Sequence, residues 1–185
     1  MLRFVPVPFT DVPHTDWRFF YSPRGVRYFY EQWDRPYRGH VATIGERTGT
    51  VVGEYGGQVS FVGTGAPEAV ARQFDEVLRS GESVLFVRAE NSRRSIQQFL
   101  PHIDQQDLVV YRNRPAPVRV PPADICVFTS PLNYQTFLQA NTLQSHQKLI
   151  AIGPTTAAAI GPRCDRVADH PGEESLAAAV MSFSG

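Results

Sequence analysis

Hydroxyl side chains stand at the starts of several predicted helices, where they could help to bind an anion. Ser22 and Ser130 each precede a proline, whereas Thr48, Thr155 and Thr156 follow a glycine within three positions. The first turn of a helix leaves backbone N–H groups unpaired and carries a partial positive charge. Hydroxyls beside such groups predict a site for a carboxylate or phosphate, although each residue taken singly could be an ordinary helix cap.

The same turns occur twice in the chain. Tyr21-Ser22-Pro23 is echoed by Thr129-Ser130-Pro131, and Ile44-Gly45 is echoed by Ile152-Gly153. The separation is constant, since 130 − 22, 153 − 45, 156 − 48 and 167 − 59 all equal 108, which also pairs Thr48 with Thr156 and Val59 with Val167. A repeat of this length predicts two similar α/β lobes that form a ligand cleft, and the paired recurrence favours binding over capping alone.

Composition excludes several other kinds of site. The chain has 18 Lys and Arg residues against 18 Asp and Glu residues, and this zero net charge argues against a nucleic-acid binder. Every basic residue except Lys148 is an arginine, the side chain best suited to bidentate recognition of carboxylates. Cys126 and Cys164 form no disulfide framework or zinc motif, and no histidine stands at ligand spacing, so no metal is expected.

Known nucleotide and membrane signatures are also missing from the sequence. No G-x-G-x-x-G or G-x-x-x-x-G-K-S/T motif occurs, so nucleotide binding has no support. The chain shows no leader and no apolar run of about 18 residues. We therefore expect a soluble, cytoplasmic protein.

The elements that must position these residues are short apolar strands alternating with helical patterns, which predict an α/β fold with parallel sheets. Strands are expected at residues 17–21, 40–44, 58–62, 83–87, 108–111, 125–129, 148–152 and 166–168, and residues 2–7 could end another. Helices are expected after Ser22-Pro23 and at residues 46–54, 66–79, 92–102, 131–140, 154–161 and 173–183. An aromatic cluster near the start of the chain is expected to pack in the core.

Two Pro-rich stretches, residues 6–13 and 114–122, are interpreted as connectors between the lobes. On this interpretation lobe B is an insertion of residues 10–117 with five strands. Lobe A is discontinuous and consists of residues 1–9 and 118–185. Compared with lobe B, lobe A lacks a first strand and helix.

Several of these segments resemble the uroporphyrinogen-III synthase (HemD-like) family. The second lobe carries the resemblance in V-F-T-S-P at 127–131, A-I-G-P-T-T-A-A at 151–158 and E-S-L at 174–176. The first lobe adds F-Y-S-P-R-G-V at 20–26, I-G-E-R-T at 44–48, V-L-F-V-R at 84–88 and L-V-V-Y-R-N at 108–113. The segments cover nearly the whole chain in the right order, and the F-T-S-P and G-P-T-T-A pair is fairly specific.

The resemblance implies a fold and a reaction. Members have two flavodoxin-like (Rossmann-like) lobes with parallel sheets, joined by a two-stranded connector. They act on the linear tetrapyrrole hydroxymethylbilane, invert its terminal D ring and close the macrocycle with loss of water. The product is uroporphyrinogen III, a precursor of haem, and the reaction needs no metal or organic cofactor. A monomer that receives its substrate from hydroxymethylbilane synthase is expected.

The resemblance also assigns roles. Tyr111 matches the functional tyrosine of the family, whose phenolic O–H can donate a hydrogen bond to the departing hydroxyl. The substrate-binding matches are Ser22, Arg24, Thr48, Thr129, Ser130, Gly153, Thr155 and Thr156. Because the net charge is zero, attraction of an anionic substrate must be local, and Arg24, Arg47 and Arg88 are candidates for it.

The chain departs from the family pattern in three places. The opening strand and helix with a T-R-P-like turn are missing, Tyr21 stands where the first lobe usually has threonine, and Glu46-Arg47 replaces a G-P-like pair. These departures keep a second hypothesis open. The alternative is a non-catalytic two-lobed α/β module that binds a tetrapyrrole or another small anion.

Overall fold

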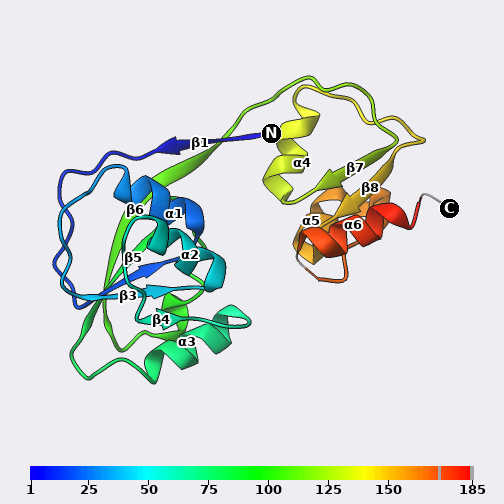
Figure 1. Cartoon of the computed structure of the whole chain (residues 1–185). Coiled ribbons are helices and arrows are strands. Elements are labelled where there is room, and N and C mark those ends of the chain that lie inside the picture. Colours follow the sequence, from blue (N-terminus) through cyan, green and yellow to red (C-terminus); the bar gives the residue numbers. More distant parts are fainter. Residues whose placement is uncertain (171, 184–185) are drawn as a thin grey trace. The chain divides into compact units, whose positions relative to one another are not determined.

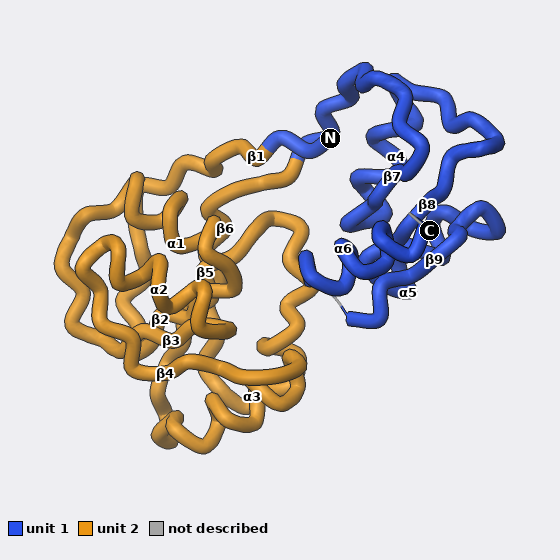
Figure 2. Tube along the Cα trace, turned by 45° about the vertical axis from the view of Figure 1, so that its right-hand side comes forward, with its two compact units in different colours: residues 1–3, 114–185 blue, residues 4–113 orange. Residues whose placement is uncertain are grey.

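The computed structural model describes residues 1–170 and 172–183, which divide into two compact units (Figures 1 and 2). Unit 1 comprises residues 1–3 and 114–185, and unit 2 comprises residues 4–113. The chain passes between the units within β1 (Leu2–Pro6) and near the end of β6 (Asp104–Pro115), which are neighbours in one sheet. Within the described residues, no helix has the length and apolar character needed to cross a membrane.

The sheet of unit 2 has a reversal in its strand order. Its other strands are β2 (Trp17–Phe20), β3 (His40–Thr43), β4 (Phe61–Val62) and β5 (Ser83–Ala89), in the order β1-β6-β5-β2-β3-β4. The pairs from β4 through β6 are all parallel. The chain runs outward from β2 to β4 and then returns to β5 on the other side of β2. In open α/β sheets, ligands bind at this switch point, beyond the carboxyl ends of the two strands.

Helices cover both faces of this sheet because its strands are apolar on both sides. Residues of α1 (Pro23–Tyr30) and α2 (Glu46–Glu54) share a core with Phe20 and Leu85. On the opposite face, α3 (Pro67–Asp75) and the segment around the 3-10 helix η1 (Gln97–Phe99) pack with Phe19 and Phe86. The alternation of neighbouring residues between the two cores follows the two-residue period of a strand.

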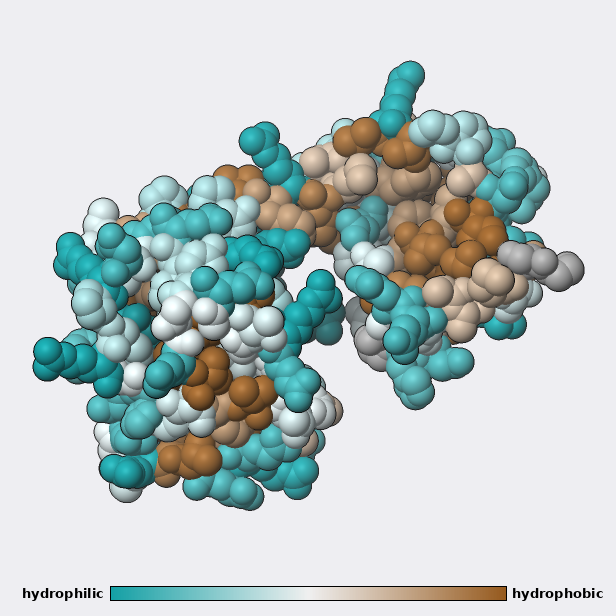
Figure 3. Space-filling view, in the orientation of Figure 1, coloured by the Kyte–Doolittle hydropathy of each residue, from teal (hydrophilic) through white to brown (hydrophobic). Residues whose placement is uncertain are grey.

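Unit 1 contains a smaller parallel sheet in the order β7-β8-β9. Its elements are β7 (Ile125–Phe128), α4 (Pro131–Leu138), β8 (Lys148–Ala151), α5 (Pro154–Ile160), η2 (Gly161–Arg163), β9 (Arg166–Val167) and α6 (Glu173–Met181). Phe128, Leu149 and Ile160 form the centre of its core. Other large apolar residues remain partly exposed, Val127 at 39% and Leu138 at 43%, and hydrophobic surface is visible on this unit in Figure 3.

The predicted repeat is confirmed in the backbone of the two units. The bounds of β2 and β7, of α1 and α4, and of β3 and β8 all differ by 108, as in 125 − 17 and 131 − 23. The turns also match: φ and ψ are −163° and 155° at Ser22, and −165° and 157° at Ser130. The match of Val59 with Val167 is not structural, because β4 pairs through Phe61 and β9 through Arg166, and 166 − 61 is 105.

The fold class is confirmed, but one predicted helix is wrong. Residues 92–102 form only the short η1, and the preceding segment is irregular. Arg94 has a φ of 52°, in the left-handed region, which interrupts a right-handed helix at that residue. Two strand lengths also differ from expectation: β6 extends well beyond residues 108–111, whereas β4 is only two residues long.

We expect the small core of unit 1 to be as sensitive to truncation as a larger one. Leu149 is fully buried on β8, so Leu149→Ala should lower the free energy of unfolding by about 3 kcal/mol, through lost burial and the cavity left behind. Val127→Ala on the neighbouring strand is the control and should change it by less than about 0.5 kcal/mol. Urea denaturation measures both, and equal losses would show that the three strands do not share a tight core.

Candidate functional site

Tyr111 lies against the start of α1 in unit 2. Its Oη is 3.3 Å from Ser22 Oγ, and either atom could be the donor. Ser22 is the N-cap of α1, and its Oγ accepts a hydrogen bond from the Gly25 N–H at 3.0 Å. That bond occupies a lone pair of Ser22 and leaves its hydroxyl hydrogen free. The structure therefore brings together two residues that the sequence places 111 − 22 = 89 positions apart.

Aromatic neighbours fix the ring of Tyr111, which is only 7% exposed. Tyr28 stacks on it with ring centroids 5.4 Å apart and an interplanar angle of 24°. Phe4 meets it edge-on at 6.2 Å, and the Tyr28 hydroxyl donates to the Phe4 carbonyl at 3.3 Å. The Arg24 guanidinium covers the ring of Phe4 at 3.4 Å. These contacts limit the directions in which the phenol can point.

A pocket of about 530 Å³ opens beside Ser22. It is lined by Ser22, Pro23, Arg24, Arg27, Tyr28, Glu31, Arg47 and Val51. Arg27 lies 3.4 Å from Glu54, whereas Arg24 and Arg47 form no ion pair with any described residue. The pocket thus offers two guanidinium groups that have no ion-pair partner among the described residues, next to a helix N-terminus, which suits it to a carboxylate.

The buried threonines of the Gly-Thr turns do not present their side chains to solvent. Thr48 is 2% exposed and Thr156 is 3% exposed, and each N–H bonds to the glycine carbonyl three residues earlier. In unit 1, Gly153 is the N-cap of α5 and Thr155 is exposed in the first turn. Thr155 is therefore the residue of this turn whose hydroxyl can meet a ligand directly.

Ser130 and Thr129 form a polar turn at the start of α4. Ser130 Oγ accepts from the Asn133 N–H at 3.1 Å, as Ser22 does from the Gly25 N–H in unit 2. Thr129 Oγ1 accepts from the Asn133 side chain at 2.8 Å. Asn133 is not among the site residues predicted from the sequence, although its position in the first helical turn after Ser130-Pro131 could have indicated a role beside these hydroxyls. It holds the two hydroxyls that the repeat predicts.

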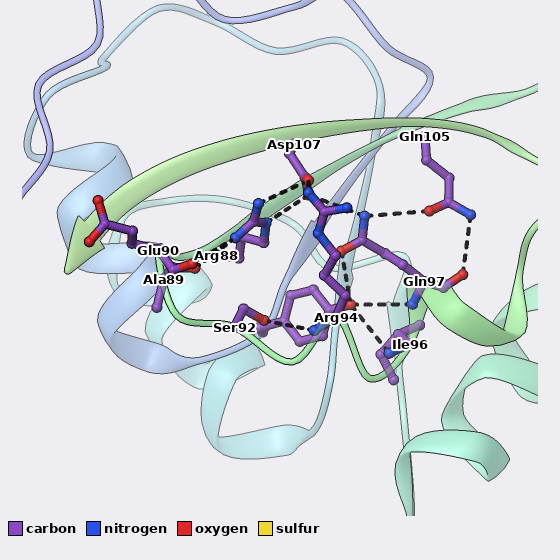
Figure 4. Close-up of polar contacts among 10 residues, drawn as sticks. Arg88, Ala89, Glu90, Ser92, Arg94, Ile96, Gln97, Gln105 and Asp107 are labelled. Atoms are coloured by element: carbon purple, nitrogen blue, oxygen red, sulfur yellow. Dashed lines mark hydrogen bonds and ion pairs between the residues drawn. The ribbon is translucent and has the colours of Figure 1, made fainter. Parts of the chain in front are cut away.

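The sequence predicts that Arg88 attracts the anionic substrate, and the structure corrects this prediction. Arg88 Nε and Nη2 donate to the two carboxylate oxygens of Asp107 at 2.8 and 3.0 Å, and Nη1 donates to the carbonyls of Ala89 and Glu90 (Figure 4). The residue is 8% exposed. Because all three nitrogens are committed within unit 2, Arg88 is an internal partner of Asp107 in this structure.

Further side chains extend this ion pair into a network. Gln97 Nε2 donates to Asp107 Oδ1 at 3.1 Å, and Arg94 Nη2 lies 2.5 Å from Asp107 Oδ2 (Figure 4). Burial acts to raise the pKa of Asp107. The hydrogen bonds and charge of Arg88, with Gln97 and Arg94, outweigh that effect and hold the pKa below its ordinary value.

Tyr21 anchors the same network from the end of β2. Its hydroxyl accepts from the N–H groups of Ile96 and Gln97 at 3.3 and 3.4 Å, and it donates to Gln97 Oε1 at 3.4 Å. Burial raises the pKa of Tyr21 to about 12, although the two backbone hydrogen bonds act in the opposite direction. The phenol therefore stays protonated. The presence of Tyr21 where the family usually has threonine marks this position in the sequence, but nothing in the sequence indicates that Ile96 and Gln97 are its partners.

Comparison with known proteins identifies the same family across almost the whole chain. The family model described as "Uroporphyrinogen-III synthase HemD" matches residues 3–178. No curated protein matches the chain.

Solved structures of uroporphyrinogen-III synthases share the fold. The enzyme from Helicobacter pylori 26695 has a TM-score of 0.79 at 21% identity, covering 98% of this chain and 90% of its own. A mutant form of the enzyme from the extremely thermophilic bacterium Thermus thermophilus has a TM-score of 0.62 at 15% identity, covering 99% of this chain and 85% of its own.

We expect Asp107→Asn to destabilise unit 2, because Arg88 would be left buried without a counter-charge. The free energy of unfolding should fall by about 3 kcal/mol near neutral pH. A carboxylate with a lowered pKa stabilises the fold above its unfolded pKa of about 4, and this contribution is lost as the pH falls through the folded pKa.

Thermal melts from about pH 7 to about pH 3 measure this effect. The gap between the original protein and Asp107→Asn should narrow as the pH falls. Asp104→Asn, at an exposed position of the same strand, should give no such gap. A constant gap at every pH would show that the ionised carboxylate is not what stabilises the network.

Proposed function

The chain belongs to the uroporphyrinogen-III synthase family, HemD, and on this premise we propose how its residues carry out the reaction. The function is that of a cyclising lyase of tetrapyrrole biosynthesis. It closes hydroxymethylbilane with inversion of the D ring and loss of water, and so forms uroporphyrinogen III. The observation that supports our assignment of roles best is the hydrogen-bond contact between Tyr111 and the N-cap serine of α1.

We propose that Tyr111 donates to the substrate hydroxyl as it departs. Ser22 already accepts from Gly25, so its own hydrogen can be donated to Tyr111 Oη. The phenolic hydrogen is then free to point at the substrate. As the phenol gives up part of its proton, the Ser22 hydroxyl and the N-terminus of α1 stabilise the negative charge on Oη. Tyr28 and Phe4 keep the ring in this orientation.

The pocket arginines suit the carboxylate side chains of the substrate. Arg24 and Arg47 have no ion-pair partner among the described residues, so binding a carboxylate does not require breaking an existing ion pair. Arg24 also keeps its stack on Phe4, which orients its guanidinium plane. We assign Arg88 a positioning role through Asp107 rather than direct contact with the substrate.

In unit 1 the two turns are proposed to bind further carboxylates. Thr129, Ser130 and Thr155 offer hydroxyls, while Gly153 gives close access to the first turn of α5. Thr48 and Thr156 are buried, so we propose that they support the turns from inside. This division follows burial, since Thr48 and Thr156 are only 2% and 3% exposed as residues, whereas Thr155 is exposed in the first turn of α5.

The compartment, the oligomeric state and the source of the substrate are part of the same proposal. We propose a cytoplasmic monomer that takes hydroxymethylbilane from hydroxymethylbilane synthase. Both cysteines of the chain, Cys126 and Cys164, are free, which suits a reducing compartment. Light scattering on the purified protein measures the oligomeric state directly.

The activity itself is measured with an isomer assay. The purified chain is supplied with freshly generated hydroxymethylbilane, and the oxidised products are separated into types I and III. Spontaneous closure gives type I, so type III above the no-protein control demonstrates the synthase. Type I alone, from protein shown to be folded, would favour a non-catalytic module that binds the tetrapyrrole.

Tyr111→Phe should lower kcat by about a hundredfold, because it removes the proposed donor and keeps the ring. The stacking with Tyr28 is retained, so we expect little change in thermal stability. Tyr55→Phe is the matched control, since Tyr55 is 40% exposed and stacks on Tyr30 away from this pocket. Type III formation at the original rate by Tyr111→Phe would contradict the assigned role.

A further inference from the structure

Arg94 occupies an unusual place in unit 2. It lies in the irregular segment between β5 and η1, which leaves the carboxyl end of β5 at the switch point of the sheet. It is the one non-glycine residue with positive φ in the described chain, at 52°. An arginine gains nothing from this backbone conformation, and such outliers concentrate at functional sites.

Asp107 does not need Arg94 as a partner. Arg88 already binds both of its carboxylate oxygens, and Gln97 donates a third hydrogen bond (Figure 4). Two guanidinium groups therefore face one carboxylate, and neither has a second ion-pair partner among the described residues, so one positive charge is in excess. The two arginines differ in exposure, since the side chain of Arg88 is 9% exposed and that of Arg94 is 58% exposed. The excess charge is carried by the group that solvent and ligands can reach.

The backbone around Arg94 is held from both sides. The Arg94 N–H donates to Ser92 Oγ at 3.3 Å, and Tyr21 Oη accepts from the N–H groups of Ile96 and Gln97. Tyr21 is followed by Ser22, and their side chains reach opposite faces of the sheet, Tyr21 toward this segment and Ser22 toward Tyr111. The turn after β2 thus connects Arg94 with the proposed catalytic tyrosine.

We propose that Arg94 binds a carboxylate of the tetrapyrrole substrate and releases Asp107 when it does so. This inference rests on the proposed function. The exchange trades an ion pair whose arginine side chain is 58% exposed for a bidentate contact with the ligand, while Arg88 keeps Asp107 neutralised. Arg94 then serves as a substrate-binding residue on the face of the sheet opposite the pocket of Arg24 and Arg47.

Arg94→Gly separates this role from a purely structural one. Glycine adopts positive φ without strain, so the variant should fold with an unchanged or slightly higher melting temperature. If Arg94 binds the substrate, KM for hydroxymethylbilane should rise about tenfold while kcat stays within about twofold. Arg94→Lys keeps the charge but loses the planar fork, and it should recover part of the loss.

Salt dependence gives a readout that a structural role would not move. Raising the ionic strength should increase KM of the original protein more steeply than that of Arg94→Gly, because one charge contact is already missing there. The net-charge control is Arg72→Gln on the exposed side of α3, which should leave KM and its salt dependence unchanged.

Binding of uroporphyrin III, measured by fluorescence, separates failure of this inference from failure of the proposed function. Type III formation with equal KM for the original protein and Arg94→Gly would overturn the role of Arg94 alone. If the original protein makes no type III but binds uroporphyrin III more tightly than Arg94→Gly does, the binding role of Arg94 would be supported and the synthase function overturned. An original protein that neither binds nor converts would overturn both.

Discussion

The turn after β2 is the constraint on which the rest of unit 2 depends. Ser22 caps α1 and contacts Tyr111, while Tyr21 holds the N–H groups at the start of η1. These two consecutive side chains thus contact a helix, Tyr111 within β6 and an irregular segment on the other face of the sheet. Because successive strand residues point to opposite faces, one short turn organises both sides of the switch point.

Asp107 is a second constraint on unit 2, because it neutralises the charge of neighbouring arginines. Among the described residues it is the one carboxylate that pairs with both Arg88 and Arg94, and a buried guanidinium without such a partner would cost several kcal/mol. The network therefore stabilises unit 2 and also sets which arginine faces solvent. Both arginines bind the same carboxylate. The buried Arg88 contributes to stability, and the exposed Arg94 is the one proposed to bind the ligand.

The repeat shows how one local structure serves different surroundings. The caps at Ser22 and Ser130 have almost the same φ and ψ, and each accepts from the N–H three residues on. Only in unit 2 does the described structure place a tyrosine hydroxyl against the capping serine. The equivalent strands also have different neighbours, since β2 lies between β3 and β5, whereas β7 is at the edge of its sheet. A shared sequence motif fixed the turn, and its neighbours decided the chemistry open to it.

The sequence alone determined the α/β class, the repeat of 108 residues, the family and nearly all helix and strand positions, because local periodicity and turn residues act over a few positions. It could not determine that Arg88 is committed to Asp107, that Thr48 and Thr156 are buried, or that residues 92–102 are mostly not helical. Those outcomes depend on contacts between segments that are far apart in the sequence, such as the ion pair of Arg88 with Asp107 of β6 and the hydrogen bond from the Ile96 N–H to the hydroxyl of Tyr21, which follows β2. The local residue pattern therefore determined the helices and strands. The tertiary structure decided which polar groups are bound to other residues of the protein and which remain available for a ligand.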